Sequence, residues 1–135
     1  MIYQSFCEKD TFEIAEILSK TAKPGQVYAL EGELASGKTV FAKGFGAGLN
    51  IKDQVTSPSY SLLNIYNGDV DLYHFDLYRL SREEISDLAP EEYFDKGVCL
   101  IEWANNAENL PVDFQIIIKK NPDKGANFRL IEVKS

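Results

Sequence analysis

The most restrictive feature of this sequence is a loop motif in its first third. Gly32 is followed by four variable residues and then by Gly37, Lys38 and Thr39. This spacing is typical of a loop whose backbone N–H groups surround phosphate oxygens, because glycines at both ends let the backbone approach the anion closely. The lysine and the threonine stand where a nucleotide needs a cation for its phosphates and a hydroxyl ligand for its Mg²⁺.

The segments on either side support this interpretation. The preceding run QVYALE is apolar without a helical period, which predicts a buried strand that ends at the loop. The following residues predict a helix from Lys38 towards Leu49, with Phe41, Phe45 and Leu49 on one face. The glycines between residues 44 and 48 either fray the end of this helix or permit close packing. A buried strand before the motif and an amphipathic helix after it argue against a chance match.

The rest of the chain predicts further strands and helices. An edge strand in IYQSF precedes a helix that Asp10 or Thr11 caps, that carries an apolar stripe of Ile14, Ile17 and Leu18, and that ends at PG. The runs VDLYHFDLY and VCLIEW predict strands, and the capping box in SREE predicts a short helix between them. Hairpins are predicted at NG after LLNIY and around NPDKGAN near the end. We therefore expect residues 1–135 to form a single P-loop NTPase-type α/β domain, with a mixed, mostly parallel sheet flanked by helices on both faces.

Composition and charge exclude several classes of protein. The formal net charge is −7, so we do not expect the chain to bind nucleic acid by itself. Cys7 and Cys99 have no metal-ligand spacing and are expected to be reduced, mostly buried thiols. The sequence has neither a basic leader nor a long apolar run, which predicts a cytoplasmic protein without a membrane span.

Triphosphate chemistry also needs a carboxylate near Mg²⁺ at the end of a neighbouring strand. Glu102 ends CLIE and Asp76 ends YHFD, and both are candidates for holding the metal or orienting the attacking water. Trp103 is either a half-buried core aromatic or a ring at the edge of the site. His74 is the one histidine, and such a strand histidine is more often structural than catalytic.

Three smaller points bear on the nucleotide. The hydroxyls of Thr56, Ser57 and Ser59 either meet the γ-phosphate or its metal, or belong to an ordinary surface loop. The chain lacks the Asn-Lys-x-Asp segment with which GTPases read guanine, so ATP is favoured. Arg79 is the nearest candidate in sequence for an arginine finger, although none is obvious.

Five separated stretches together resemble one protein family. GELASGKTVFAKG, VTSPSYSLLNIY, YHFDLYRL, EEYF and GVCLIEW occur in an order and at separations similar to those of the TsaE (YjeE) family, which are ATPases of tRNA threonylcarbamoyladenosine synthesis. The resemblance covers nearly the whole chain. It implies a Mg²⁺-dependent ATPase that works with the proteins TsaD and TsaB on adenosine 37 of tRNA, with tRNA reached only indirectly through that complex.

The resemblance also implies roles for individual residues. Lys38, Asp76 and Glu102 would be catalytic, and Thr39, Glu102 and Asp76 would lie at the metal. The residues implied to contact the nucleotide are Gly32, Leu34, Ala35, Ser36, Gly37, Lys38, Thr39, Cys7, Lys9, Thr11, Trp103 and Arg129. The family usually reads GDLGAGKT, whereas this chain has Ala35 in place of the second glycine. If that position has a positive φ, alanine costs about 1 kcal/mol or more.

Two rival functions share the same loop. A small-molecule kinase would need an acceptor pocket and usually an arginine-rich lid, which the sequence does not contain. A nucleotide-gated scaffold would bind ATP only to set the shape of a protein-binding surface.

Overall fold

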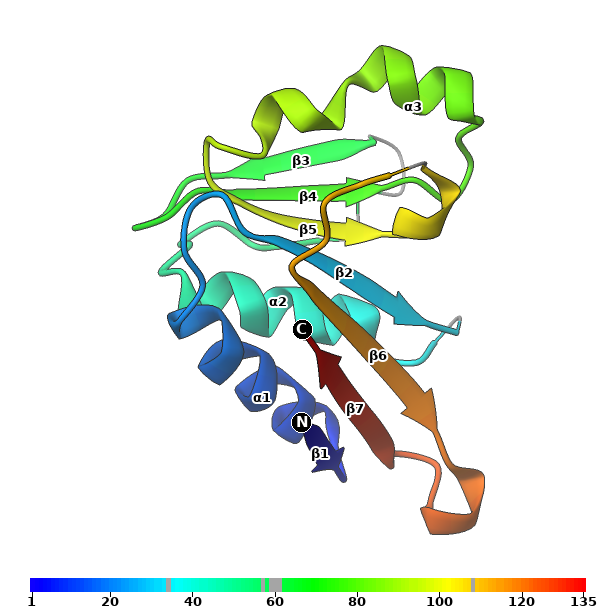
Figure 1. Ribbon diagram of the computed structural model, residues 1–135. Helices are drawn as coiled ribbons and strands as arrows, with labels where there is room; N and C mark the ends of the chain where they lie inside the picture. The colour runs from blue at the N-terminus through cyan, green and yellow to red at the C-terminus, as the bar shows by residue number, and fades with distance from the viewer. Residues whose placement is uncertain (34, 57, 59–61, 108) are drawn as a thin grey trace.

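The computed structural model describes residues 1–33, 35–56, 58, 62–107 and 109–135. These residues form one seven-stranded sheet with helices on both of its faces (Figure 1). The elements are, in chain order, β1 (Ile2–Ser5), α1 (Glu8–Lys20), β2 (Val27–Gly32), α2 (Lys38–Gly48), β3 (Leu63–Tyr66), β4 (Leu72–Asp76), α3 (Arg82–Leu88), the 3-10 helix η1 (Pro90–Tyr93), β5 (Val98–Glu102), η2 (Ala104–Asn106), β6 (Phe114–Lys120), η3 (Pro122–Lys124) and β7 (Arg129–Lys134).

The strands lie in the order β1-β7-β6-β2-β5-β4-β3. The central ladders β6–β2, β2–β5 and β5–β4 are parallel, while β1–β7, β7–β6 and β4–β3 are antiparallel. All strands except β3 and β7 therefore point the same way, which confirms the predicted mixed, mostly parallel sheet. The carboxyl ends of β2, β4 and β5 consequently meet at one edge of the sheet, where open α/β sheets place their ligands.

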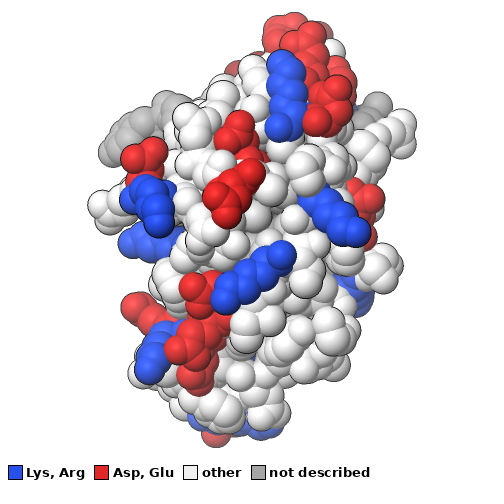
Figure 2. All heavy atoms as spheres, turned by 90° about the vertical axis from the view of Figure 1, so that its left-hand side faces the viewer, with Lys and Arg blue, Asp and Glu red and all other residues white. Residues whose placement is uncertain are grey.

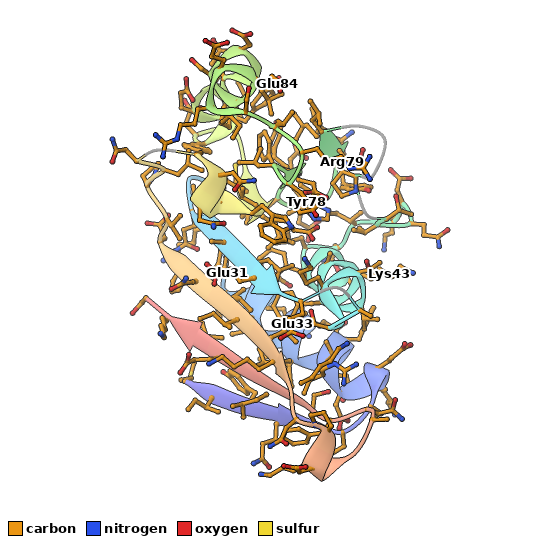
Figure 3. All side chains as sticks on the ribbon, turned by 90° about the vertical axis from the view of Figure 1, so that its right-hand side faces the viewer. Glu31, Glu33, Lys43, Tyr78, Arg79 and Glu84 are labelled. Carbon is orange, nitrogen blue, oxygen red and sulfur yellow. The ribbon has the colours of Figure 1, made fainter. Side chains whose placement is uncertain are left out.

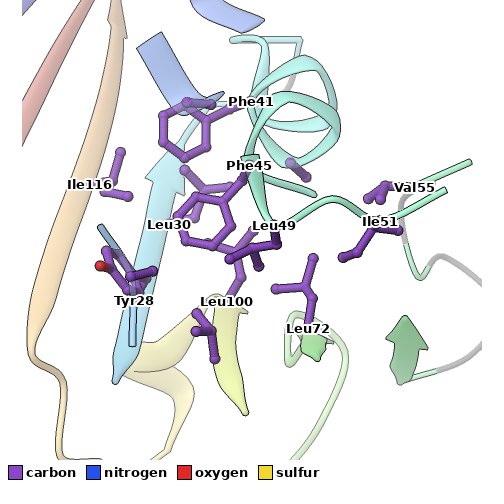
Figure 4. Close-up of a cluster of buried hydrophobic side chains, with 14 of the residues drawn as sticks. Tyr28, Leu30, Phe41, Phe45, Leu49, Ile51, Val55, Leu72, Leu100 and Ile116 are labelled. Carbon is purple, nitrogen blue, oxygen red and sulfur yellow. The ribbon is translucent and has the colours of Figure 1, made fainter. Parts of the chain in front are cut away.

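Two hydrophobic clusters hold the helices against the sheet. Helices α1 and α2 cover one face, where the predicted stripe of Phe41, Phe45 and Leu49 is almost fully buried against β2 and β5 (Figure 4). Helix α3 covers the other face, and its one buried residue, Ile85, joins a cluster that contains Phe75 of β4. The capping box that begins α3 at Ser81 is present as predicted.

The charged residues are distributed unevenly. Helices α3 and η1 together carry five acidic residues and one arginine, namely Glu83, Glu84, Asp87, Glu91, Glu92 and Arg82. On the face shown in Figure 2, acidic and basic side chains alternate, and acidic ones gather at the top, at the height of α3. No helix in the described ranges is long and apolar enough to cross a bilayer.

Four expectations about local structure were wrong. Helix α1 begins at Glu8, because Cys7 is its N-cap, and Ile17 is 63% exposed. The buried residues of α1 are instead small, since this helix packs very closely against α2. The predicted hairpin between β3 and β4 forms, but Tyr66 pairs with Leu72, so five residues connect the strands in place of a tight turn at NG. Cys7 is exposed, whereas Cys99 is buried as expected, and burial raises the pKa of the Cys99 thiol to about 12.

The glycines of α2 permit the close contact between α1 and α2. A Cβ atom at Gly44 would collide with the backbone carbonyl of Phe12, and one at Gly48 would collide with that of Glu16. Both obstacles are main-chain atoms of a packed helix and cannot rotate away. The glycines therefore allow close packing, and α2 continues through them to its end at Gly48.

Gly44→Ala is expected to lower the free energy of unfolding by about 1–3 kcal/mol, since overpacking outweighs the gain in helix propensity. Chemical denaturation measures this effect. Lys43→Ala adds an alanine to the same helix at a position that points outward (Figure 3) and should change stability by less than about 0.5 kcal/mol. Equal effects of the two substitutions would contradict the close-packing argument.

Candidate functional site

A cavity of about 850 Å³ opens at the edge of the sheet where β2, β4 and β5 end. Figure 3 faces this edge, with Tyr78 on one side of the end of β2 and Glu33 on the other. The cavity is lined by Cys7, Glu8, Thr11, Glu33, Ala35, Ser36, Gly37, Lys38, Thr39, Val40, Asp76, Tyr78, Glu102, Trp103, Asn127 and Arg129. Most of the residues predicted for the site are therefore brought together.

Glycines bound the segment between β2, which ends at Gly32, and α2, which begins at Lys38 after Gly37. A Cβ atom at Gly32 would collide with the Ser36 side chain and lie 3.2 Å from the carbonyl oxygen of Ile118, which favours glycine there. Ala35 has φ 61° and Gly37 has φ 104°, both in the left-handed region. The condition under which Ala35 would be strained is thus met. Helix α2 starts directly after Gly37, and its N-terminal end faces the cavity, where the first N–H groups of a helix have no partner within the helix and favour an anion.

Four ionisable side chains converge behind the loop. Lys38 Nζ lies 3.7 Å from Glu102 Oε1, and His74 Nε2 lies 2.8 Å from Glu102 Oε2. Asp76 is paired with Glu102 in the register of β4 and β5, so the two carboxylates are neighbours on adjacent strands. Lys38 Nζ is also 5.4 Å from the centre of the Trp103 ring, which lies 36% exposed at the edge of the site. A cation and two oxygen-donor carboxylates therefore face one cavity.

His74 supports Glu102 from the interior of the protein. Its side chain is fully buried and does not line the cavity. A hydrogen on Nε2 donates to the carboxylate, while Nδ1 has no hydrogen-bond partner among the described residues. The imidazole thereby fixes one carboxylate oxygen and leaves the other towards Lys38, which is a structural role in orienting Glu102.

The environment of Asp76 changes its titration. Partial burial raises the pKa of this carboxyl group, and the nearby Glu102 raises it further, while the Tyr78 N–H that donates to Asp76 Oδ1 at 3.0 Å, Lys38 and His74 oppose the rise. The folded protein thus binds this proton more tightly than the unfolded chain does. The free energy of unfolding consequently falls as pH rises through the range between the two pKa values, and the ionised carboxylate lowers stability at neutral pH.

Asp76→Asn is therefore expected to raise the melting temperature at pH 7 by about 1–3 °C and to leave it nearly unchanged at pH 4. Asparagine does not ionise, yet its oxygen still accepts the Tyr78 N–H. Thermal unfolding at the two pH values measures this, with the exposed Asp87→Asn as the control. A variant less stable than wild type at pH 7 would show that the carboxylate charge stabilises the fold.

Several predicted residues lie elsewhere or carry other contacts. Lys9 does not line the cavity, and its Nζ lies 3.9 Å from Glu13 on the exposed side of α1. Arg79 is exposed away from the cavity, and Thr56 lies outside it. Arg129 lines the cavity, but its guanidinium group donates to backbone carbonyls of the loop. Leu34, Ser57 and Ser59 fall outside the described residues.

Sequence reasoning missed Tyr78, Asn127 and Glu8, which also line the cavity. Tyr78 had a signal, because it follows the end of β4 by two residues and its ring centre lies 4.8 Å from that of Trp103. No sequence signal marked Asn127, since only the strand order brings the C-terminal hairpin to the edge of the sheet where the cavity opens.

Comparison with known proteins gives a consistent result. The family model for the threonylcarbamoyl adenosine biosynthesis protein TsaE matches residues 6–128. The TsaE protein of Bacillus subtilis (strain 168) is 46% identical over 119 residues, which cover 85% of this chain and 75% of that protein. The TsaE protein of Treponema pallidum (strain Nichols) is 42% identical over 106 residues, covering 76% of this chain and 78% of that protein.

A solved structure agrees. The crystal structure titled as YdiB of Bacillus subtilis superposes with a TM-score of 0.80 and 37% identity, covering 97% of this chain and 82% of that one. With the family model matching most of the chain, this protein belongs to the TsaE family of threonylcarbamoyl adenosine biosynthesis proteins.

Proposed function

We propose that this chain is a Mg²⁺-dependent ATPase that supports tRNA threonylcarbamoyladenosine synthesis in complex with TsaD and TsaB. The observation that carries the proposal is the loop of residues 32–39, which ends on the N-terminus of α2 and opens into a cavity with Lys38, Asp76 and Glu102. The volume of this cavity, about 850 Å³, suits a nucleotide, since ligand cavities measure roughly 300–1,000 Å³.

The loop supplies the phosphate contacts. Backbone N–H groups of Gly37, Lys38 and Thr39 bind phosphate oxygens, and the positive end of α2 adds to their field. Lys38 would exchange part of its interaction with Glu102 for the phosphates, because its side chain lines the cavity and its Nζ lies 3.7 Å from Glu102 Oε1.

The donor set fits Mg²⁺. The Thr39 hydroxyl and the carboxylates of Glu102 and Asp76 offer the oxygen ligands that this ion prefers. Within the described ranges, no group of three or more His, Cys, Asp or Glu side chains could hold a metal alone, in keeping with an ion that arrives bound to its nucleotide. When bound, Mg²⁺ would neutralise charge on the β- and γ-phosphates.

The remaining chemistry belongs to the protein. Glu102, whose carboxylate is held by His74, would bind the metal, while Asp76 would hold the attacking water near the γ-phosphate. Arg129 is the one arginine among the described lining residues, and its donors already bind carbonyl oxygens. Hydrolysis should therefore be slow in isolation and faster when a partner supplies or orders the missing cation. Because the proposed function uses ATP and serves tRNA, we expect the protein to act in the cytoplasm. It would contact tRNA only through the complex with TsaD and TsaB.

Phosphate release from Mg²⁺-ATP tests this proposal. The purified chain is assayed alone, with purified TsaD and TsaB, and the partners are assayed without it. Low release by the chain that rises at least about tenfold with the partners supports the partner-activated ATPase. Nucleotide binding without release in any mixture would point to a nucleotide-gated scaffold, and transfer of label to a metabolite would point to a kinase.

A further inference from the structure

We propose that Arg129 is a positioning residue that clamps the phosphate loop in its nucleotide-receiving conformation against the backbone strain at Ala35. The inference rests on the proposed nucleotide site. It assigns to Arg129 an action through the loop in place of the direct nucleotide contact expected from the sequence.

All three nitrogens of the guanidinium group take part in the clamp. Nε donates to the carbonyl oxygen of Ser36 at 2.8 Å, and Nη2 donates to that of Ala35 at 3.3 Å. Nη1 donates to the carbonyl oxygens of Ala126 and Phe128 at 2.9 and 2.8 Å. One side chain at the start of β7 therefore joins the turn of the C-terminal hairpin to two consecutive peptides of the loop.

These contacts fix the direction of the loop peptides. Ser36 is only 1% exposed, so water has little access to replace Arg129 as the partner of this residue's carbonyl. In a trans peptide the C=O and N–H groups point in opposite directions, so the N–H of Gly37 points away from Arg129. A reversed peptide would turn a carbonyl oxygen towards the phosphates and repel them. By fixing the direction of the Ser36 carbonyl, Arg129 thus also fixes the N–H of Gly37 in a direction in which it can donate to the anion.

The clamp opposes a local strain. Ala35 has φ 61°, a left-handed conformation that a residue with a Cβ atom rarely adopts. Without a constraint, the loop would relax towards conformations in which Ala35 has a negative φ and the adjoining peptides are rotated. Arg129 binds the carbonyls of Ala35 and of the next residue, which are the groups that would move.

Arginine suits this task better than lysine. A planar guanidinium group presents donors in fixed directions and can reach several carbonyls at once, whereas a lysine has a single flexible ammonium group. Arg129→Lys therefore keeps the positive charge near the phosphates but removes the geometry of the clamp.

A rescue experiment tests the proposal, using the wild-type chain, Arg129→Lys, Ala35→Gly and the double variant. The first measurement is the affinity for ADP. Arg129→Lys is expected to weaken binding roughly tenfold, because the receptive loop becomes a minor state. Ala35→Gly alone is the reference for the double variant, whose ADP affinity should lie within about threefold of that reference, because glycine at position 35 carries no strain for the clamp to oppose.

The second measurement needs no nucleotide. Hydrogen exchange of the Gly37 and Lys38 amides in the free chain should accelerate roughly tenfold in Arg129→Lys and return towards wild type in the double variant. If wild type binds no ADP, the proposed function fails, yet the exchange data still decide whether the clamp exists. Lys124→Met is the matched charge control, since Lys124 lies in the same hairpin with its Nζ 5.2 Å from the Phe128 ring centre.

Three results would overturn the proposal. Unchanged exchange in Arg129→Lys would show that the loop keeps its conformation without the clamp. A loss that Ala35→Gly does not rescue would assign the effect to general damage of the hairpin, because Ala35 lies outside that hairpin. Loss of ADP affinity in Lys124→Met as large as in Arg129→Lys would assign it to charge alone.

Discussion

Glu102→Gln is expected to slow phosphate release from Mg²⁺-ATP by at least about 100-fold, while binding of ADP in Mg²⁺-free buffer changes little. Glutamine keeps the shape of the side chain, and its amide oxygen still accepts the hydrogen on His74 Nε2, which lies 2.8 Å from the carboxylate. It removes the negative charge that faces Lys38 and that would hold Mg²⁺. Single-turnover release over a range of Mg²⁺ concentrations separates weaker metal binding from slower chemistry.

The chain offers a matched control for this substitution. Glu31 lies one residue before the end of β2, outside the 850 Å³ cavity, and accepts a hydrogen bond from Gln115 at 2.7 Å. Glu31→Gln should leave release within about twofold of wild type. If Glu102→Gln hydrolyses ATP normally at saturating Mg²⁺, Asp76 is the acid that the reaction needs and Glu102 serves the fold.

The strand, loop and helix around residues 26–49 were predictable because their signals are local. An apolar run without a helical period, a glycine-bounded loop and a stripe at helical spacing each depend on neighbouring residues. The same logic identified Asp76 and Glu102 as strand ends. The departure at Ala35 could also be recognised from the sequence, since the energetic cost of a positive φ depends on the residue itself, and φ at Ala35 is indeed positive.

The rest depends on contacts between distant segments. The sequence predicted two acidic strand ends, but only the parallel register of β4 and β5 makes Asp76 and Glu102 neighbours. The strand order likewise brings Asn127 and Arg129 to the cavity. Ile17 was assigned to the core because α1 was expected to bury large residues. Instead, the glycines of α2 let the face of α1 that carries small residues pack against α2, and Ile17 is exposed. That the whole chain is one domain stays a prediction.

Lys38→Met is expected to weaken ADP binding by about 100-fold, because it removes the one lysine that lines the described cavity. Lys38 is the first residue of α2 and its side chain is mostly buried, so no other cation moves easily into its place. Methionine preserves most of the apolar stem that packs beside Trp103. The loss therefore measures the charge, and isothermal titration with ADP quantifies it.

The same substitution also tests the pairing of Lys38 with Glu102. Glu102 is 6% exposed and, of its two side-chain partners among the described residues, would retain His74 alone, so Lys38→Met should also lower the free energy of unfolding in the absence of nucleotide. Lys43→Met on the outward face of α2 is the control and should alter neither quantity appreciably (Figure 3). Wild-type affinity in Lys38→Met would reject the proposed ATP site, because Lys38 lines the same cavity as the loop that is proposed to bind the phosphates.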